Sequence, residues 1–262
     1  MKQLSLNKAK QVAVEAAHKA GYILLESLKN KELQIRHKSL VDLVTEADTA
    51  SEKLIIEIIK QTFPSHNIIS EEYGKEDKGS SYTWLIDPLD GTTNYAHGIS
   101  HFSVSIALQK ENDVIVGVVY DPCKNWLFSA VKSHGAYLNN NPITVSDTNE
   151  LINALLATGF PYKSRESVLP MFNELIPRVR GIRRTGSAAL DLCYVASGKF
   201  DGYWEFMMKP WDIYAGLLIL KEAGGKVSYF NARQESRINI VASNGKIHEE
   251  LLSTYEKFGS KK

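Results

Sequence analysis

Residues 84–94, with the sequence WLIDPLDGTTN, constrain the fold most, because they join an apolar segment to a forced turn. The apolar start of this stretch predicts a buried strand. Pro88 fixes its own φ and lacks an amide donor, and Gly91 tolerates backbone conformations that other residues avoid, so the strand must end in a turn. Asp87 and Asp90 then lie close together at the strand end. Because Mg²⁺ prefers oxygen ligands and often binds beside a substrate phosphate, we predict a metal and phosphate site here.

The same stretch has a simpler interpretation. Asp-Pro and Asp-Gly are common turn dipeptides, and Asp and Asn side chains often cap local backbone groups without taking part in any chemistry. The isolated DPLDG sequence therefore supports a plain turn about as well as a metal site. Features elsewhere in the chain have to decide between the two.

The composition excludes several classes of protein. With 262 residues, 44% of them hydrophobic and 23% charged, the chain can form one large domain or two closely packed halves. Lys and Arg number 31 and Asp and Glu 30, and the net charge of +1 argues against nucleic acid or an anionic membrane as a partner. The N-terminal residues lack the apolar core of a signal peptide, and no apolar run is long enough to span a membrane.

The two cysteines, Cys123 and Cys193, form neither a disulfide framework nor a CxxC motif. A reduced, cytoplasmic location is therefore expected, with both cysteines as packing residues and not nucleophiles.

The first part of the chain predicts helices followed by antiparallel strands. Apolar residues at three- and four-residue steps predict an amphipathic helix over residues 5–29, and a capping-box pattern at residues 45–48 predicts a second helix that ends before Pro64. A short strand over residues 67–70 leads into Glu71. The strands expected after the WLID segment cover residues 102–108, 114–120 and 126–131. Two polar segments are predicted to lack strands: KEDKGSSY as a mobile loop, and HGAYLNNNPI as a run of turns.

In the second part of the chain, predicted strands and helices alternate. The strands are expected in the segments ALLATG, GIRRT, FDGYWEF, GKVSYF and INIVASN, and the helices over residues 165–175, 187–196 and 212–223 and at the C-terminus. Such alternation predicts a sheet covered by helices. We expect an α+β half over residues 1–145 and an α/β half over residues 146–262, packed as one compact unit.

Several charged residues have structural interpretations when each is taken alone. Asp48 fits a helix cap, and Asp212 fits a carboxylate near a helix N-terminus, which is stabilising in any protein. Adjacent acids such as Glu71 and Glu72 are usually solvated. The arginines that precede the TGS sequence form a basic cluster that suits a solvated edge strand, a phosphate clamp or, least well, a nucleic-acid surface; they are Arg178, Arg180, Arg183 and Arg184.

Taken together, these residues resemble the inositol monophosphatase family of metal-dependent, lithium-sensitive phosphatases. The strongest marker is DPLDGTTN with its apolar lead-in, and the second is WDIYAGLLILKEAGG, which lies at the expected distance downstream. The resemblance covers nearly the whole chain. It implies an α/β fold, a layered αβαβα sandwich of the inositol monophosphatase and fructose-1,6-bisphosphatase type, and usually a homodimer.

The resemblance also implies roles for individual residues. The metal ligands would be the carboxylates of Glu71, Asp87, Asp90 and Asp212 and the main-chain carbonyl of Leu89. The catalytic residues would be Glu71, Thr92 and Asp48, with Thr92 and Asp48 helping to activate the attacking water. The amides of Gly91 and Thr92 would bind the phosphate. The other substrate-binding residues would be Asp90, Gly186, Ser187, Ala188, Glu205 and Asp212.

These roles imply an inositol-phosphate phosphatase, which is a phosphoric monoester hydrolase. About two or three Mg²⁺ ions would offset the phosphate charge and activate a water for direct in-line attack, without a phosphoenzyme. Inhibition by Li⁺ is implied by the family alone. The partners expected are a small phosphorylated substrate and a second copy of the chain.

The substrate stays open among related esters. Arg183 and Arg184 could favour a second phosphate or a larger substrate, so NADP(H) phosphatase or fructose-1,6-bisphosphatase activity is the alternative, alone or as a dual activity. The segment FPYKSRES, residues 160–167, corresponds to a stretch in which family members differ and which often sets substrate choice. The segment His37-Lys38-Ser39 does not align with the lysine of the family's metal-binding loop. A regulatory, RNA-associated or transcription-associated protein is the non-enzymatic alternative, and a structural Ca²⁺ module is disfavoured because the EF-hand spacing is lacking.

Overall fold

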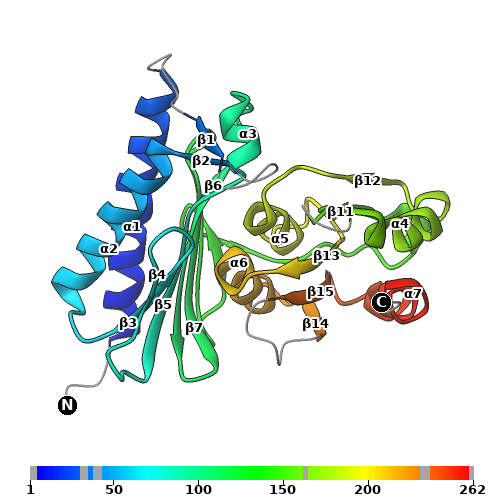
Figure 1. The fold of residues 1–262 in the computed structure, drawn as a ribbon. Helices are drawn as coiled ribbons and strands as arrows, with labels where there is room; N and C mark the ends of the chain where they lie inside the picture. The colour runs from blue at the N-terminus through cyan, green and yellow to red at the C-terminus, as the bar shows by residue number, and fades with distance from the viewer. Residues whose placement is uncertain (1–4, 30–34, 38–42, 162–164, 231–236, 260–262) are drawn as a thin grey trace.

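One outer layer of the molecule is a pair of helices, α1 (Leu6–Lys29) and α2 (Glu46–Thr62). The computed structural model describes residues 5–29, 35–37, 43–161, 165–230 and 237–259. In α1, small buried residues recur along one side of the helix, so α2 and the adjoining sheet can approach closely: Ala9, Ala13, Ala16, Ala17 and Ala20. Two short strands, β1 (Ile35–His37) and β2 (Leu43–Thr45), form an antiparallel pair near these helices (Figure 1).

The next layer is an eight-stranded sheet with the order β10-β9-β8-β7-β6-β5-β3-β4. Its strands are β3 (Asn67–Ser70), β4 (Gly74–Glu76), β5 (Tyr82–Asp90), β6 (Ser103–Lys110), β7 (Asp113–Asp121), β8 (Trp126–Val131), β9 (Ala136–Leu138) and β10 (Asn141–Ile143). Strand β3 is parallel to β5, so both carboxyl ends lie at the same edge of the sheet. The short helix α3 (Thr92–Ala96) follows β5 directly.

Helices α5 (Ala188–Ala196) and α6 (Pro210–Glu222) lie between this sheet and a second one (Figure 1). The second sheet has five strands in the order β12-β11-β13-β15-β14. They are β11 (Leu155–Thr158), β12 (Gly181–Arg183), β13 (Gly202–Met208), β14 (Lys226–Phe230) and β15 (Ile238–Ser243). Helices α4 (Leu169–Leu175) and α7 (His248–Thr254) cover the outer side.

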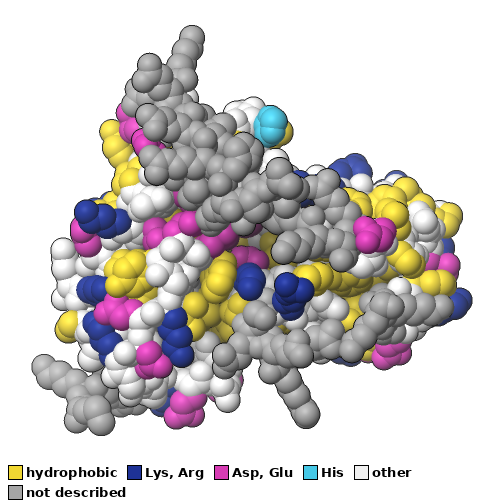
Figure 2. All heavy atoms as spheres, in the orientation of Figure 1, with side chains coloured by type: hydrophobic (Ala, Val, Ile, Leu, Met, Phe, Trp, Pro, Cys, Tyr) yellow, Lys and Arg dark blue, Asp and Glu magenta, His cyan; other side chains and the backbone are white. Residues whose placement is uncertain are grey.

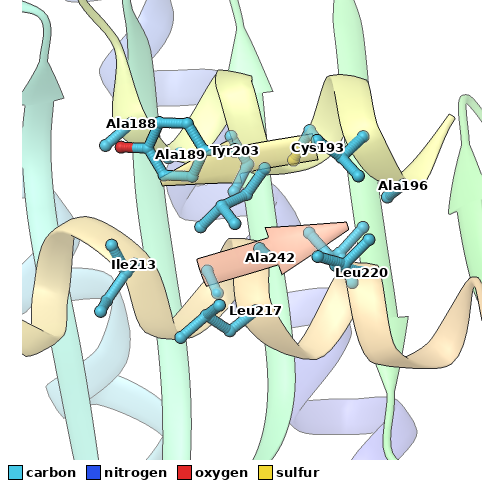
Figure 3. Close-up of a cluster of buried hydrophobic side chains, with 14 of the residues drawn as sticks. Ala188, Ala189, Cys193, Ala196, Tyr203, Ile213, Leu217, Leu220 and Ala242 are labelled. Carbon is cyan, nitrogen blue, oxygen red and sulfur yellow. The ribbon is translucent and has the colours of Figure 1, made fainter. Parts of the chain in front are cut away.

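Side-chain alternation along the strands explains why both faces of each sheet are covered. On β5, Trp84 and Ile86 pack in the core beneath α1 and α2, whereas Leu85 points to the opposite core beside α5 and α6. On β13, Tyr203 belongs to this central core and Trp204 to the core beneath α4 and α7. Figure 3 shows the central core, where small side chains of α5 face larger ones of α6. The layered αβαβα sandwich expected from the resemblance is therefore confirmed.

Three expectations about local structure need correction. The polar segment predicted as a mobile loop begins with β4, which pairs with β3, and Asn67 Oδ1 accepts the backbone N–H groups of Lys78 and Ser80 farther along it. The segment predicted as turns contains β9 and β10, which pair with each other. The helix expected from residue 165 begins as a 3₁₀ turn, Arg165–Val168, and is α-helical only from Leu169.

The division of the chain at residues 145 and 146 stays a prediction. The first sheet ends at Ile143 and the second begins at Leu155, so the predicted boundary falls between them. Within the described ranges, no helix is both long and apolar enough to cross a membrane.

Candidate active site

The carboxyl end of β5 is distorted where the DPLD sequence lies. Asp87 is paired with Ser105 of β6 and Asp90 with Ser103, so two residues of β5 bulge against one of β6. The Leu89 N–H donates to Asp87 Oδ1 at 2.9 Å. Gly91 then has a φ of 103°, and a Cβ there would lie 3.1 Å from the Gly186 carbonyl oxygen, so glycine is needed both for the turn and for the close approach.

Two further acids reach this edge from neighbouring elements. Glu71 follows β3, and its N–H donates to the Ile86 carbonyl of β5 at 3.2 Å. Asp212 lies in the first turn of α6, where its Oδ2 accepts the Lys209 N–H at 2.9 Å. The start of α6 is held against the first sheet because Ser105 Oγ donates to the Trp211 carbonyl at 3.1 Å.

Asp90 connects the first sheet to helix α5. Its Oδ2 accepts the Ser187 hydroxyl at 2.5 Å and the Ala189 N–H at 2.9 Å, and its Oδ1 accepts the Ala188 N–H at 3.2 Å. A carboxylate at this position satisfies amides that the first turn of a helix leaves unpaired. Ala188 is one of the residues expected to contact substrate, and its N–H is engaged by Asp90.

A second connection between the same regions comes from the last residue of the DPLDGTTN motif. Asn94 Nδ2 donates to the Thr185 carbonyl at 2.8 Å and to the His101 carbonyl at 2.7 Å. The turn before α5 is thus fixed relative to the turn after β5 by the side chains of both Asp90 and Asn94.

These elements enclose a cavity of about 560 Å³. Its wall contains every predicted site residue except Asp48, namely Glu71, Asp87, Leu89, Asp90, Gly91, Thr92, Gly186, Ser187, Ala188, Glu205 and Asp212. Asp48 is buried on α2, at 2% exposure, and its charge acts on Asp87. Figure 2 shows Asp and Glu side chains gathered near the middle of one face, with Lys and Arg side chains beside them.

The acids at the cavity repel one another. Burial raises the pKa of the Asp87 carboxyl well above its usual value, and the charge of Glu71 raises it further, followed by Asp90, Asp212 and Asp48. Burial likewise raises the pKa of Asp212, again with a contribution from Glu71. Burial raises the pKa of Asp90 to about 6, although the hydrogen bonds from Ser187 and the α5 amides oppose the shift. A cation would relieve this repulsion.

The donor chemistry fits a hard divalent cation, because every ligand predicted is an oxygen. Across the residues with a described placement, however, no three His, Cys, Asp or Glu side chains form a group that could hold a metal ion as they stand. Asp87, Asp90 and Asp212 each have an oxygen turned to a backbone N–H. The carboxylates would have to turn toward a common point to share an ion.

Two more acids line the cavity, one on the second sheet and one on α5. Glu205 on β13 accepts the Tyr203 hydroxyl, and burial raises the pKa of Glu205 to about 7. Its carboxylate faces Gly159, where a Cβ would lie 1.9 Å from Glu205 Oε1. Asp191 on α5 accepts the Thr185 hydroxyl at 2.6 Å, and burial raises the pKa of its carboxyl well above the usual value.

Some residues of the cavity were missed by sequence reasoning. Asp191 had a signal, since it is the one charged residue in the apolar helix AALDLCYVA. Lys209 and Arg237 also line the cavity, and neither belongs to a recognisable motif. Arg184 of the basic cluster lines it as well. Arg183, by contrast, is exposed and lies outside the cavity wall.

Other candidate nucleophiles are not prepared for catalysis. Burial raises the pKa of both thiols, that of Cys193 strongly, so neither is held as a thiolate. His97 is exposed, and His101 packs edge-on against Tyr194 with ring centroids 5.8 Å apart. Glu72 does not line the cavity, and its N–H is bound by Glu52. Lys38, Ser39 and residues 162–164 lie outside the described residues, as does the side chain of His37.

Comparison with known proteins gives consistent matches over the whole chain. A model described as "Inositol monophosphatase family" matches residues 5–260. A Haemophilus influenzae protein named Nus factor SuhB is 45% identical over 256 residues, covering 95% of this chain and 96% of that protein. An Aquifex aeolicus protein named fructose-1,6-bisphosphatase/inositol-1-monophosphatase is 43% identical over 258 residues, 97% of each chain. The solved inositol monophosphatase from Anabaena superposes with a TM-score of 0.86 at 43% identity, covering 97% of each chain.

Proposed function

Since this chain belongs to the inositol monophosphatase family, we propose that it is a Mg²⁺-dependent phosphomonoesterase that releases phosphate from inositol monophosphate. The observation that carries this proposal is the shared cavity of Glu71, Asp87, Asp90 and Asp212, which come from strand β5, helix α6 and the turn after β3. Holding mutually repelling carboxylates in one cavity is costly unless a cation joins them, so their shared position supports a metal-dependent reaction.

Glu71, Asp87, Asp90, Asp212 and the Leu89 carbonyl would hold the metal. When bound, Mg²⁺ offsets the charge of the phosphate, lowers the pKa of bound water and stabilises the leaving oxygen.

The chain's own residues would position the reactants. Thr92 Oγ1 donates to the Leu89 carbonyl at 3.1 Å, so the hydroxyl oxygen is left to accept a hydrogen bond from a water in the cavity. The proton that this water loses would pass through the Thr92 hydroxyl to the Asp48 carboxylate, the pair that the resemblance implies for activation of the water. The backbone N–H groups of Gly91 and Thr92 would donate hydrogen bonds to the phosphate oxygens.

Glu205 and Ser187 would contact the alcohol part of the substrate. Tyr203 donates its hydroxyl to Glu205, which fixes the direction of that carboxylate in the cavity. At neutral pH, a carboxyl group with a pKa of about 7 can donate or accept a hydrogen bond, which suits a substrate hydroxyl.

A second candidate is a substrate with an additional phosphate, such as fructose 1,6-bisphosphate or NADP. It is favoured by the cations on the cavity wall, Arg184, Lys209 and Arg237, which lie on the side of the second sheet. The Aquifex relative carries both names. The non-enzymatic alternative gains support only from the name Nus factor, because the basic cluster is divided: Arg178 is paired with Glu174 and Glu250, and Arg184 lines the cavity.

The enzyme is tested by phosphate release from a panel of inositol 1-phosphate, fructose 1,6-bisphosphate and NADP, with and without Mg²⁺ and Li⁺. Turnover should require Mg²⁺ and fall to about a hundredth or less in Asp90→Asn. Asp121→Asn is the control, because Asp121 is also an acid at the end of a strand of the first sheet but bonds Lys124 outside the cavity. Unchanged turnover in the Asp90 variant would remove the metal role. Sedimentation of the same samples tests the proposed homodimer.

A further inference from the structure

Besides Asp48, helix α2 carries a second acid that is almost completely buried, Glu52, at 4% exposure. It does not line the cavity, and no motif marks it. Its Oε1 accepts the Glu72 N–H at 2.9 Å, the Tyr73 N–H at 3.1 Å and the Ser70 hydroxyl. One oxygen of a helix residue thus gathers three donors from a turn about twenty residues farther along the chain.

These bonds surround Glu71, the acid that this turn presents to the cavity. On the side of the first sheet, the Glu71 N–H is bound by the Ile86 carbonyl at 3.2 Å. On the other side, the next two N–H groups point at Glu52. Because the backbone is held before and after Glu71, the direction in which its side chain leaves the turn depends on the Glu52 carboxylate.

Helix geometry places Glu52 beside Asp48. The two residues are four positions apart and therefore lie on the same side of α2. Asp48 acts on Asp87 through its charge, whereas Glu52 acts on the backbone next to Glu71. Helix α2 therefore carries two acids that act on residues of the cavity wall, in addition to covering the sheet.

We propose that Glu52 is a positioning residue that holds the turn of residues 70–73 so that the Glu71 carboxylate faces a bound cation. This inference rests on the proposed function, because it assumes that Glu71 is a metal ligand. Outer residues that orient a ligand typically change metal affinity by about 10- to 100-fold when they are removed.

The test is the dissociation constant of Mg²⁺, measured by titration calorimetry on the full-length protein. Glu52→Ala removes the acceptor, and Glu52→Asp keeps the charge but draws the oxygen back by one methylene, so both should weaken Mg²⁺ binding by about 10- to 100-fold. Glu52→Gln keeps the length and an acceptor oxygen and should bind Mg²⁺ nearly as the unaltered protein does. In a Glu71→Gln background, Glu52→Ala should cause little further loss, because its effect passes through Glu71.

The chain offers a matched control in Glu222. Its carboxylate likewise accepts three hydrogen bonds, here from the backbone N–H groups of Ser133 at 2.8 Å, His134 at 3.0 Å and Gly135 at 2.9 Å, but that turn lies outside the cavity wall. Glu222→Ala should therefore reduce stability without changing Mg²⁺ affinity.

The outcomes separate this inference from the proposed function. If Glu71→Gln weakens Mg²⁺ binding but Glu52→Ala and Glu52→Asp do not, Glu52 only stabilises the turn and the inference is wrong. An equal loss in the Glu71→Gln background would contradict it as well. If Glu71→Gln itself binds Mg²⁺ like the unaltered protein, the metal role of Glu71 falls, and both proposals fall with it.

Discussion

Replacing Gly159 by alanine should damage the alcohol side of the cavity while leaving the metal side intact. The new Cβ would lie 1.9 Å from Glu205 Oε1 and 2.0 Å from its carboxyl carbon, and 3.0 Å is the least separation that real Cβ atoms show. The carboxylate must therefore move by about 1.1 Å, the difference between 3.0 and 1.9 Å. It is buried and bonded to the Tyr203 hydroxyl, so this movement breaks or distorts that bond.

A displacement of about 1 Å in a positioning group can cost about 100-fold in rate, which is about 2.7 kcal/mol of transition-state stabilisation. Overpacking itself should lower the free energy of unfolding by about 1–3 kcal/mol. We expect kcat/KM for inositol 1-phosphate to fall by about 100-fold, while the Mg²⁺ dissociation constant is retained because Glu205 is not a predicted ligand. Steady-state kinetics, titration calorimetry and urea unfolding measure the three quantities.

Gly181→Ala is the control for this experiment. A Cβ at Gly181 would meet only the flexible side chains of Arg183, at 3.2 Å, and Leu155, at 3.6 Å, on a strand of the same sheet. Its kinetics should match those of the unaltered protein. Unaltered kcat/KM in Gly159→Ala, in a protein that unfolds as expected, would refute the role given to Glu205.

Further predictions concern pH and stability. Because the folded state raises the pKa of Glu205 from 4.5 to about 7, this group should contribute a loss of about 3 kcal/mol of stability to the metal-free protein as pH rises between these values; Glu205→Gln should reduce the loss by about that amount in urea unfolding with a chelator present. Mg²⁺ binding should strengthen as pH rises through about 6, where Asp90 loses its proton, and calorimetry at pH 5 and pH 8 would show the difference. Burial lowers the pKa of His248, which lies 2.9 Å from Ser228 Oγ and 3.0 Å from Ser243 Oγ, so this group should contribute a loss of stability as pH drops below about 6.5, and thermal unfolding should show that His248→Gln removes this contribution. Glu222→Ala should cost about 1–3 kcal/mol in urea unfolding, because three backbone N–H groups lose their acceptor.

The sequence is most informative where function depends on local geometry. Pro88 and Gly91 force the turn after β5, and the apolar residues before them identify the strand, so the positions of Asp87 and Asp90 follow from a short stretch of chain. Asp212 is different. Its position as a helix carboxylate is clear from the sequence, but its place in the cavity depends on how α6 packs against the first sheet, which only the family resemblance implied.

Other features depend on contacts between distant segments and leave little local signal. Glu52 lies on a helix with many charged residues, so its burial against the turn after β3 cannot be distinguished in the sequence from exposure to solvent. Strands β4, β9 and β10 have three residues each, too few to show an alternation of apolar residues, and they form because a neighbouring strand offers free backbone groups.

The bonds made by Asp90 give ion binding a mechanical consequence. One carboxylate holds the end of β5 to the first turn of α5, so an ion bound to that carboxylate, as proposed, would resist movement of α5 relative to the first sheet. Because the coupling between two sites is reciprocal, a change that weakens the contact between α5 and the first sheet would also lower the affinity for the ion. A chelator should therefore make amides at the start of α5 exchange faster with solvent, even though no residue of that helix is a predicted ligand.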